Sequence, residues 1–329
     1  MDPITQGLLG AAVTQAVLGR RLGKRAWLVG AIGGMAADLD VLIRSPSDPL
    51  VGWQFHRHFT HSVAFIPFGG VLASLPWILR KRFATVRRDI IAGTTVGYAT
   101  HALLDAFTSY GTMLWWPLSD MRVAWSWISI VDPIYTGILG IGVVLAARRL
   151  SMRPARIALL LSSLYMVLGF VQRARVLDAT QQLATSRGHT VERIDAYPAP
   201  PTNLMWRTTY LSEGRVYISQ ARAPWWSPVR VRPGESVELV TEPPAAIAED
   251  PATREGFEVF QWFARGWVGW DPKYPDVLAD LRYGLVGGSA SSMWGVQLRP
   301  GQSPAVQSHR GPMEDAMGPR WRDLLGDGW

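Results

Sequence analysis

The chain has 329 residues, of which 48% are hydrophobic, and it has no cysteine and a formal net charge of +7. The lack of cysteine excludes a fold stabilised by disulfides. The charge does not indicate nucleic acid as a partner, because the basic residues gather in short loops between apolar segments and form no continuous basic stripe.

Apolar windows in the first half predict membrane helices, since a helix needs about 20 such residues to cross a bilayer core. The first window, 4–18, is short and could instead lie in the interface. No signal peptide is evident, because the chain begins without a basic segment. We therefore expect an α-helical membrane bundle of five or six transmembrane helices, the other five windows being 27–43, 62–79, 90–108, 128–147 and 157–171.

Three short loops at 20–25, 80–88 and 148–156 carry most of the arginine and lysine in this half. The positive-inside rule places all three in the cytoplasm of a bacterial-type cell, so the protein is expected in the inner (plasma) membrane as a multi-pass protein. Helices threaded between these loops carry the histidines and aspartates described below to the opposite side. The same threading makes the C-terminal part extracytoplasmic.

The composition shifts at about Arg173, after which proline, glycine and tryptophan become frequent. Alternating stretches at 216–220 and 229–232 predict short strands, and 173–185 is expected to continue the last helix as a stalk. We expect a transmembrane helical domain over 1–175 and a small extracytoplasmic domain, mixed α/β or mostly β, over 176–329. The tail from about residue 300 is expected to be loose.

The chemistry of the first half lies in its histidines and aspartates. His101 and Asp105 are four residues apart, so on a helix they share one face, where they could bind one metal ion or the carboxylate could orient the imidazole. A polar pair that only packs helices together is the alternative. Ionisable groups within a membrane segment favour the functional interpretation, because they are costly there unless a partner holds them.

His56 and His61 flank a loop that could turn both side chains toward one point, whereas His58 could simply face lipid headgroups. Asp38 and Asp40 close the preceding apolar window. Two residues that are two apart point the same way only if the helix has ended and the backbone is extended. Metal coordination would offset the unfavourable position of carboxylates at a helix C-terminus.

Two Asp-Pro pairs have a structural explanation. Asp2 and Asp132 each precede a proline, the arrangement of a helix N-cap followed by proline at the first helical position. Both remain second-tier site candidates, together with His58, because the topology places them on the side of the ligands.

Five ordered motifs resemble those of the YdjM-type membrane-bound metal-dependent hydrolases: MDPITQGLLG (1–10), ADLD (37–40), HRHFTHS (56–62), HALLDAFTSYGT (101–112) and VDPIY (131–135). The resemblance covers roughly the first 150 residues. It implies a metal-dependent hydrolase with six residues in the motif positions: Asp38, Asp40, His56, His61, His101 and Asp105. The first motif usually has histidine after threonine, but here it has Gln6. Either one metal position is lost or weakened, or Gln6 contacts substrate.

We therefore interpret the chain as a membrane hydrolase that binds one or more divalent metals. His56, His61, His101 and Asp105 would be the principal ligands, and Asp38 and Asp40 would complete the site or act as general base. Nitrogen and oxygen ligands favour zinc, with manganese or iron as alternatives. A weaker similarity to the zinc-dependent phospholipase C and P1 nuclease group favours a phosphoester, such as a phospholipid or lipid-linked phosphate at the outer leaflet.

Two non-enzymatic interpretations compete with this one. A transporter or metal-binding protein could use the same polar groups, although a transporter is expected to show paired repeats or broken helices. A scaffold whose outer domain binds a partner would leave the histidines without a role. The expected partners are the bilayer and a small-molecule or lipid substrate.

Overall fold

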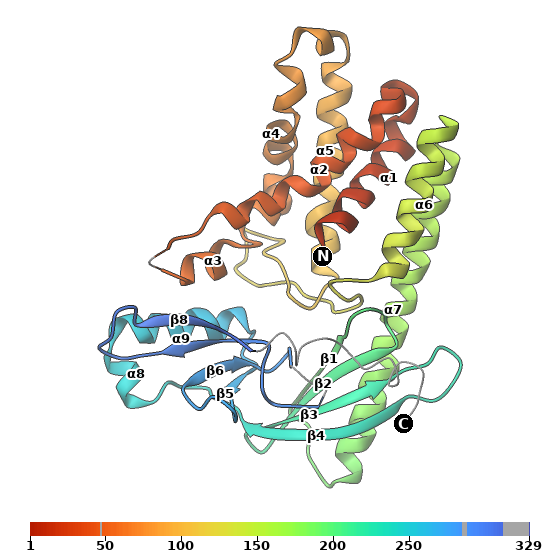
Figure 1. Cartoon of the computed structure of the whole chain (residues 1–329). Coiled ribbons are helices and arrows are strands. Elements are labelled where there is room, and N and C mark those ends of the chain that lie inside the picture. The colour runs from red at the N-terminus through yellow and green to blue at the C-terminus, as the bar shows by residue number, and fades with distance from the viewer. Residues whose placement is uncertain (47, 285–287, 312–328) are drawn as a thin grey trace. The chain divides into compact units, whose positions relative to one another are not determined.

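Helices make up the first half of the computed structural model, which describes residues 1–46, 48–284, 288–311 and 329 (Figure 1). They are α1 Pro3–Leu22, α2 Ala26–Met35, α3 Leu50–Phe55, α4 Ile66–Ile78, α5 Arg87–Ala106, α6 Pro133–Arg149 and α7 Arg153–Ser186. Short 3₁₀ helices at Gly23–Arg25, Ala36–Leu42, Phe59–His61, Val63–Phe65 and Lys81–Val86 interrupt the path between them.

Both Asp-Pro pairs begin helices, as the sequence predicts. The Asp2 side chain accepts a hydrogen bond from the Thr5 backbone N–H at 3.0 Å at the start of α1. Asp132 accepts from the backbone N–H groups of Ile134 and Tyr135, each at 3.1 Å, at the start of α6. These bonds satisfy donors that the first turn of a helix leaves without a partner.

Helices α1, α2 and α5 pack closely because glycines meet at their crossings. A side chain at Gly10 would collide with the carbonyl oxygen of Gly30, and one at Gly97 would collide with the same oxygen. Gly33 lies equally close to the backbone of Thr94. Small residues let helix backbones approach one another, and here the approach brings the end of α2 beside α5, where the candidate site lies.

The prediction of five or six transmembrane helices is wrong. Among the described residues, one helix, α7, is long and apolar enough to span a membrane. A bent pair, Leu50–His61 with Val63–Ile78, passes the same test only when taken together, and its halves are inclined at 62°.

The apolar windows fail as spans for two reasons. Helix α2 has 10 residues and α4 has 13, which gives lengths of about 15 and 20 Å against a hydrocarbon core of about 30 Å. Helices α1 and α5 are longer but carry charged and amide side chains. The predicted placement of the ligands and of the C-terminal domain outside the cytoplasm depended on counting crossings, and it no longer follows.

The second half contains two antiparallel sheets of four strands each, in the orders β1-β2-β3-β4 and β5-β6-β7-β8. Trp206 and Trp267 are fully buried in it. The strands predicted at 216–220 and 229–232 correspond to β3 and the start of β4. The elements are β1 Arg193–Pro198, β2 Met205–Ser212, β3 Arg215–Arg222, β4 Arg230–Glu238, α8 Ala245–Glu249, α9 Pro251–Phe263, β5 Val268–Trp270, β6 Val277–Asp280, β7 Trp294–Leu298 and β8 Val306–Arg310.

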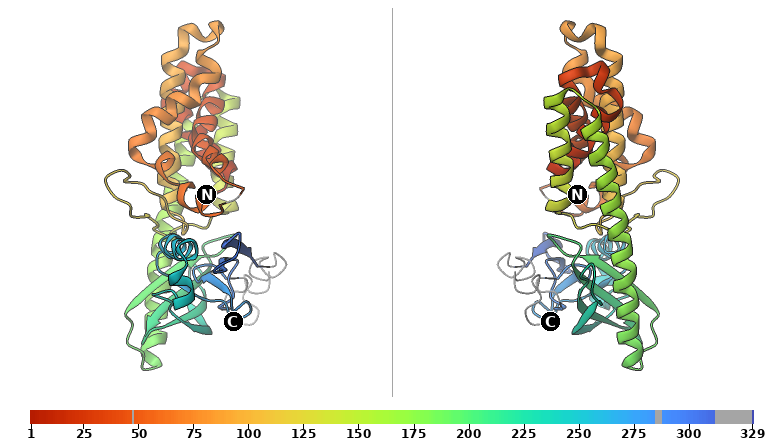
Figure 2. Two further views of the ribbon diagram at one scale, coloured as in Figure 1. Left: turned by 90° about the vertical axis from the view of Figure 1, so that its left-hand side faces the viewer. Right: turned by 90° about the vertical axis from the view of Figure 1, so that its right-hand side faces the viewer.

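The chain divides into two compact units. Unit 1 comprises Met1–Ile43 and Phe55–Gly169, and unit 2 comprises Arg44–Gln54 and Phe170–Trp329. Figure 2 shows α7 as one unbroken helix, which continues through the segment expected as a stalk. Of the tail predicted to be loose, Val306–Arg310 forms a strand, and residues 312–328 lie outside the described part of the chain.

Candidate metal centre

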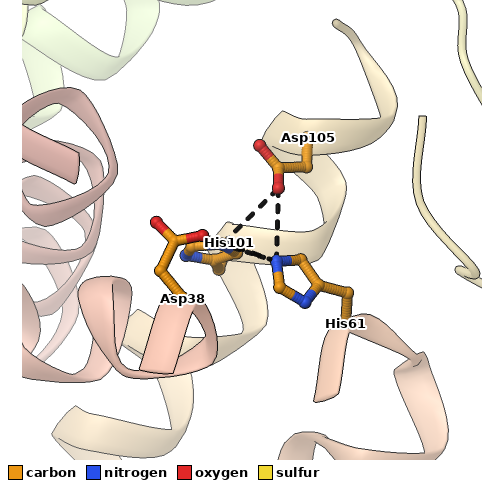
Figure 3. A group of neighbouring side chains, drawn as sticks. All are labelled: Asp38, His61, His101 and Asp105. Atoms are coloured by element: carbon orange, nitrogen blue, oxygen red, sulfur yellow. Dashed lines mark hydrogen bonds and ion pairs between the residues drawn. The ribbon is translucent and has the colours of Figure 1, made fainter. Parts of the chain in front are cut away.

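Four side chains from three elements of unit 1 converge on one point (Figure 3). Asp38 comes from the 3₁₀ helix that follows α2, His61 ends another 3₁₀ helix, and His101 and Asp105 lie one turn apart on α5. One nitrogen or oxygen from each lies within 4.8 Å of all the others. All four are among the metal ligands predicted from the sequence.

The imidazole rings of His61 and His101 meet edge-on, with an interplanar angle of 75°. Their Nε2 atoms are 2.9 Å apart. Asp105 Oδ2 lies 3.3 Å from the His61 Nε2 and 3.5 Å from that of His101. On another side, Asp38 Oδ1 lies 3.3 Å from the His101 Nε2 and 3.8 Å from that of His61.

The hydrogen bonds of the Nδ1 atoms indicate which nitrogens carry protons. His101 Nδ1 lies 2.5 Å from the carbonyl oxygen of Gly34, so it donates. His61 Nδ1 lies 3.0 Å from the Thr60 hydroxyl, which itself donates to Asp40 Oδ2 at 2.9 Å, so this nitrogen also donates. In the neutral rings both Nε2 atoms therefore present lone pairs to the centre of the cluster.

This donor set fits a divalent cation. Two imidazole lone pairs and two carboxylate oxygens would repel one another unless a positive charge lay between them. Asp105 Oδ2, at the centre, accepts no hydrogen bond of normal geometry from the described residues, and the charged Arg57 Nε lies 3.1 Å from it. Two nitrogen and two oxygen donors match the ligands that zinc prefers, and metal-binding histidines usually donate their other N–H to a carbonyl or carboxylate.

Electrostatics also make the centre attract positive charge. Burial disfavours a charged His101, but the carboxylates of Asp105 and Asp38 outweigh burial and raise its pKa. Burial likewise opposes the charge on Asp105, yet nearby Arg57 and the chain's amino group, with the two imidazoles, hold the pKa of Asp105 well below its usual range. A proton or a metal ion can supply the charge that the cluster attracts.

Asp40 does not join the four ligands but supports one of them. It accepts hydrogen bonds from the Thr60 hydroxyl and from the Arg57 backbone N–H at 2.8 Å, and it lies 2.8 Å from His56 Nδ1. Burial opposes its charge, but the bonds from His56 and His61 lower the pKa of Asp40 well below its usual range. With its oxygens engaged in this way, Asp40 fits the orientation of His61 better than general-base catalysis.

Asp38 and Asp40 do not point the same way, because the backbone between them is helical and not extended. Both lie in the 3₁₀ helix Ala36–Leu42, in which residues two apart point about 120° away from each other around the axis. Asp38 faces the cluster and Asp40 faces His56. His56 is thereby held beside the cluster, with its ring centre 6.2 Å from that of His61.

Gln6 lies beside the cluster and contacts the candidate ligand Asp105, but it does not reach the point where the four donor atoms converge. Its amide nitrogen donates to Asp105 Oδ1 at 2.9 Å, the carboxylate oxygen that faces away from the imidazoles and that the amino group of Met1 also contacts. Gln6 is fully buried on α1. Gln6 stands where the first motif usually has histidine. Because Gln6 contacts Asp105 and contributes none of the four converging donor atoms, the amide leaves these four donors in place.

Arg57 is a site residue that sequence analysis did not single out. Its Nε lies 3.1 Å from Asp105 Oδ2, and its guanidinium lies over the Tyr110 ring at 4.6 Å. The backbone at Arg57 is left-handed, with φ of 62°, which turns the chain between His56 and His61. Its place between His56 and His58 could have drawn attention to it. The sequence alone does not show, however, which way a long arginine side chain points.

The remaining candidates lie outside the cluster. His58 packs against Trp116, with ring centres 5.6 Å apart. Asp2 caps α1. Asp132 caps α6 and accepts a hydrogen bond from the Tyr165 hydroxyl at 2.8 Å. The structure gives each of these three residues a structural contact.

The model of the YdjM inner membrane protein family matches residues 1–176, a range that includes all four converging residues. Searches of curated proteins and of solved structures found no match. Since the matched range is more than half of the chain, the protein belongs to the YdjM inner membrane protein family.

Proposed function

We propose that this protein is a metal-dependent hydrolase whose divalent cation is held by Asp38, His61, His101 and Asp105. The observation that supports the proposal is the convergence of two imidazole lone pairs and two carboxylate oxygens on one buried point. Zinc is the first candidate for this donor set, and manganese or iron also accept it.

The side chains differ in access, which suggests their roles. Those of His61, His101 and Asp105 are fully buried, whereas 20% of Asp38 is exposed. Substrate therefore approaches from the side of Asp38. Asp38 Oδ1 faces the imidazoles as the metal ligand, and the other oxygen of this carboxylate is the candidate general base. A divalent cation at the cluster supplies Lewis acidity toward an ester oxygen and toward water.

A phosphoester is the substrate class that we propose. Arg57 places a fixed positive charge beside Asp105, and preorganised positive charge stabilises the anionic transition state of phosphoryl transfer. Since the family is one of inner membrane proteins, a phospholipid or lipid-linked phosphate is the substrate to test first. The choice of leaflet rested on the crossing count and is not part of the proposal.

The test is metal content by elemental analysis of the purified full-length protein, combined with hydrolysis of phosphomonoesters, phosphodiesters and phospholipids. We expect stoichiometric divalent metal and hydrolysis that stops on chelation and returns when the metal is restored. The variant His101→Ala should lose both metal and activity, and His58→Ala should retain both. Bound metal without hydrolysis of any ester would instead favour a transporter or metal-binding protein.

A further inference from the structure

A tryptophan-rich loop joins β3 to β4 in unit 2. Its sequence is Pro224-Trp225-Trp226-Ser227-Pro228, and 93% of Trp226 is exposed. Trp225 is 38% exposed, and its indole N–H donates to the Asn203 side chain at 3.0 Å. Trp225 is thus held in place by the fold, whereas no hydrogen bond or ring contact with the described residues holds the large apolar ring of Trp226, which lies in water.

The loop is fastened to α7 by side chains from one turn of that helix. Gln172 donates to the carbonyl oxygen of Ala223 at 2.5 Å. Arg175 donates to the carbonyl oxygens of Pro224 at 2.9 Å and of Ser227 at 2.5 Å. Next to Arg175 on α7, Val176 packs with Trp206 and Ala223 in one buried cluster. The position of the loop along α7 is therefore fixed.

These bonds lie where the apolar part of α7 ends. Residues 157–172 carry no charge and would cover about 24 Å as a helix. Apolar side chains along this segment are exposed, including Leu160 at 60%, Leu164 at 57% and Val167 at 53%. Arginines flank the segment on both sides, at 153, 156, 173 and 175. This is the pattern of a membrane span with arginines beyond both of its ends.

We propose that the loop 224–228 is a membrane-interface anchor that inserts Trp226 among the lipid headgroups beside the Gln172–Arg175 end of α7. Tryptophan favours this region because its ring is apolar and its N–H is polar. The hydrogen bonds to α7 hold the loop at the boundary between apolar and charged residues, where the bilayer surface must lie if α7 spans. The anchor does not depend on the proposed hydrolase activity.

The absence of cysteine from the chain allows a single probe to be placed. In full-length Ser227→Cys, both tryptophans remain and a fluorophore on the thiol reports on the loop. The matched control is Glu213→Cys in the exposed turn at the opposite end of β3, roughly 25 Å away at 3.3 Å per residue. Both are reconstituted into vesicles of phosphatidylethanolamine and phosphatidylglycerol, with and without lipids that carry a nitroxide quencher near the headgroup.

We expect lipid quenching of the probe at 227 to exceed that at 213 several-fold, and iodide in the water to quench 213 more than 227. Adding Trp226→Ala to the 227 variant should reduce its lipid quenching. Equal lipid quenching at the two positions would overturn the proposal. Protection of the 227 probe from iodide without quenching by the nitroxide lipids would also overturn it, because the loop would then be covered by protein and not by lipid.

Discussion

Unit 2 buries an ion pair whose partners satisfy each other. Arg282 donates to both carboxylate oxygens of Asp280, at 2.9 and 2.7 Å, and also to the carbonyl oxygen of Phe263 at 3.0 Å. Both side chains are completely buried. One positive and one negative charge cancel, and the fork of the guanidinium matches the carboxylate.

Unit 1 buries charge in a different way. Asp38 and Asp105 face two imidazoles whose Nε2 atoms point at each other. Asp105 Oδ2 accepts no hydrogen bond of normal geometry from the described residues, although the charged Arg57 Nε lies 3.1 Å away. Burial alone does not distinguish the two places, since both are shielded from water. The difference lies in whether the buried donors and acceptors satisfy one another, and it indicates a structural pair in unit 2 and a ligand site in unit 1.

The largest effect is expected from breaking the pair in unit 2. Arg282→Met leaves Asp280 as an uncompensated buried charge, and it should lower the free energy of unfolding by about 3–5 kcal/mol. Denaturant unfolding of the purified protein measures this change. The double variant Arg282→Met/Asp280→Leu should recover most of the loss, because apolar residues can replace a buried pair. A double variant as unstable as the single one would contradict the comparison.

Removing a candidate ligand in unit 1 should lower the affinity for divalent metal more than it lowers the stability of the fold. His61→Ala, His101→Ala and Asp105→Ala should each weaken divalent metal binding by more than about 100-fold, the upper range for changes to residues that only support ligands. Metal titration of stripped protein gives the affinities. His58→Ala is the matched control, since this histidine packs against Trp116. Unchanged metal binding in all three ligand variants would rule out the site.

A smaller effect is expected at Asp40, which holds His61 in place through Thr60. Asp40→Asn keeps the size of the side chain but removes the charge, and it should weaken metal binding about 10–100-fold. Asp132→Asn changes another buried carboxylate, at the start of α6, and should leave metal affinity unchanged. If the two variants behave alike, Asp40 has no specific role in orienting the ligand.

The smallest effect concerns Gln6. Gln6→Leu removes the amide that donates to Asp105 Oδ1, and we expect about a 10-fold loss of metal affinity, the low end for a supporting residue. Gln15 offers a control on the same helix, since its buried amide donates to the carbonyl oxygen of Val143 at 3.1 Å. Gln15→Leu should alter stability alone. An equal change of metal affinity in both variants would mean that Gln6 acts only through packing of α1.

The sequence by itself determined the local features of this protein. Asp-Pro pairs mark helix starts because capping needs only neighbouring residues. The spacing of His101 and Asp105 predicts a shared face because the helical period is fixed. Residue chemistry likewise identified all four converging side chains as ligand candidates, and the alternating stretches indicated strands in the second half.

Tertiary structure decided what depends on where helices end and what they pack against. The window at 62–79 has no charged residue, and the window at 27–43 has only Asp38 and Asp40. A 3₁₀ helix nevertheless takes up part of each window, which hydrophobicity does not reveal. The 3₁₀ geometry also separates Asp38 from Asp40, and the left-handed backbone at Arg57 decides which histidine reaches the centre. These outcomes arise from backbone directions set by distant contacts, such as the glycine crossings of α1, α2 and α5, so no local pattern encodes them.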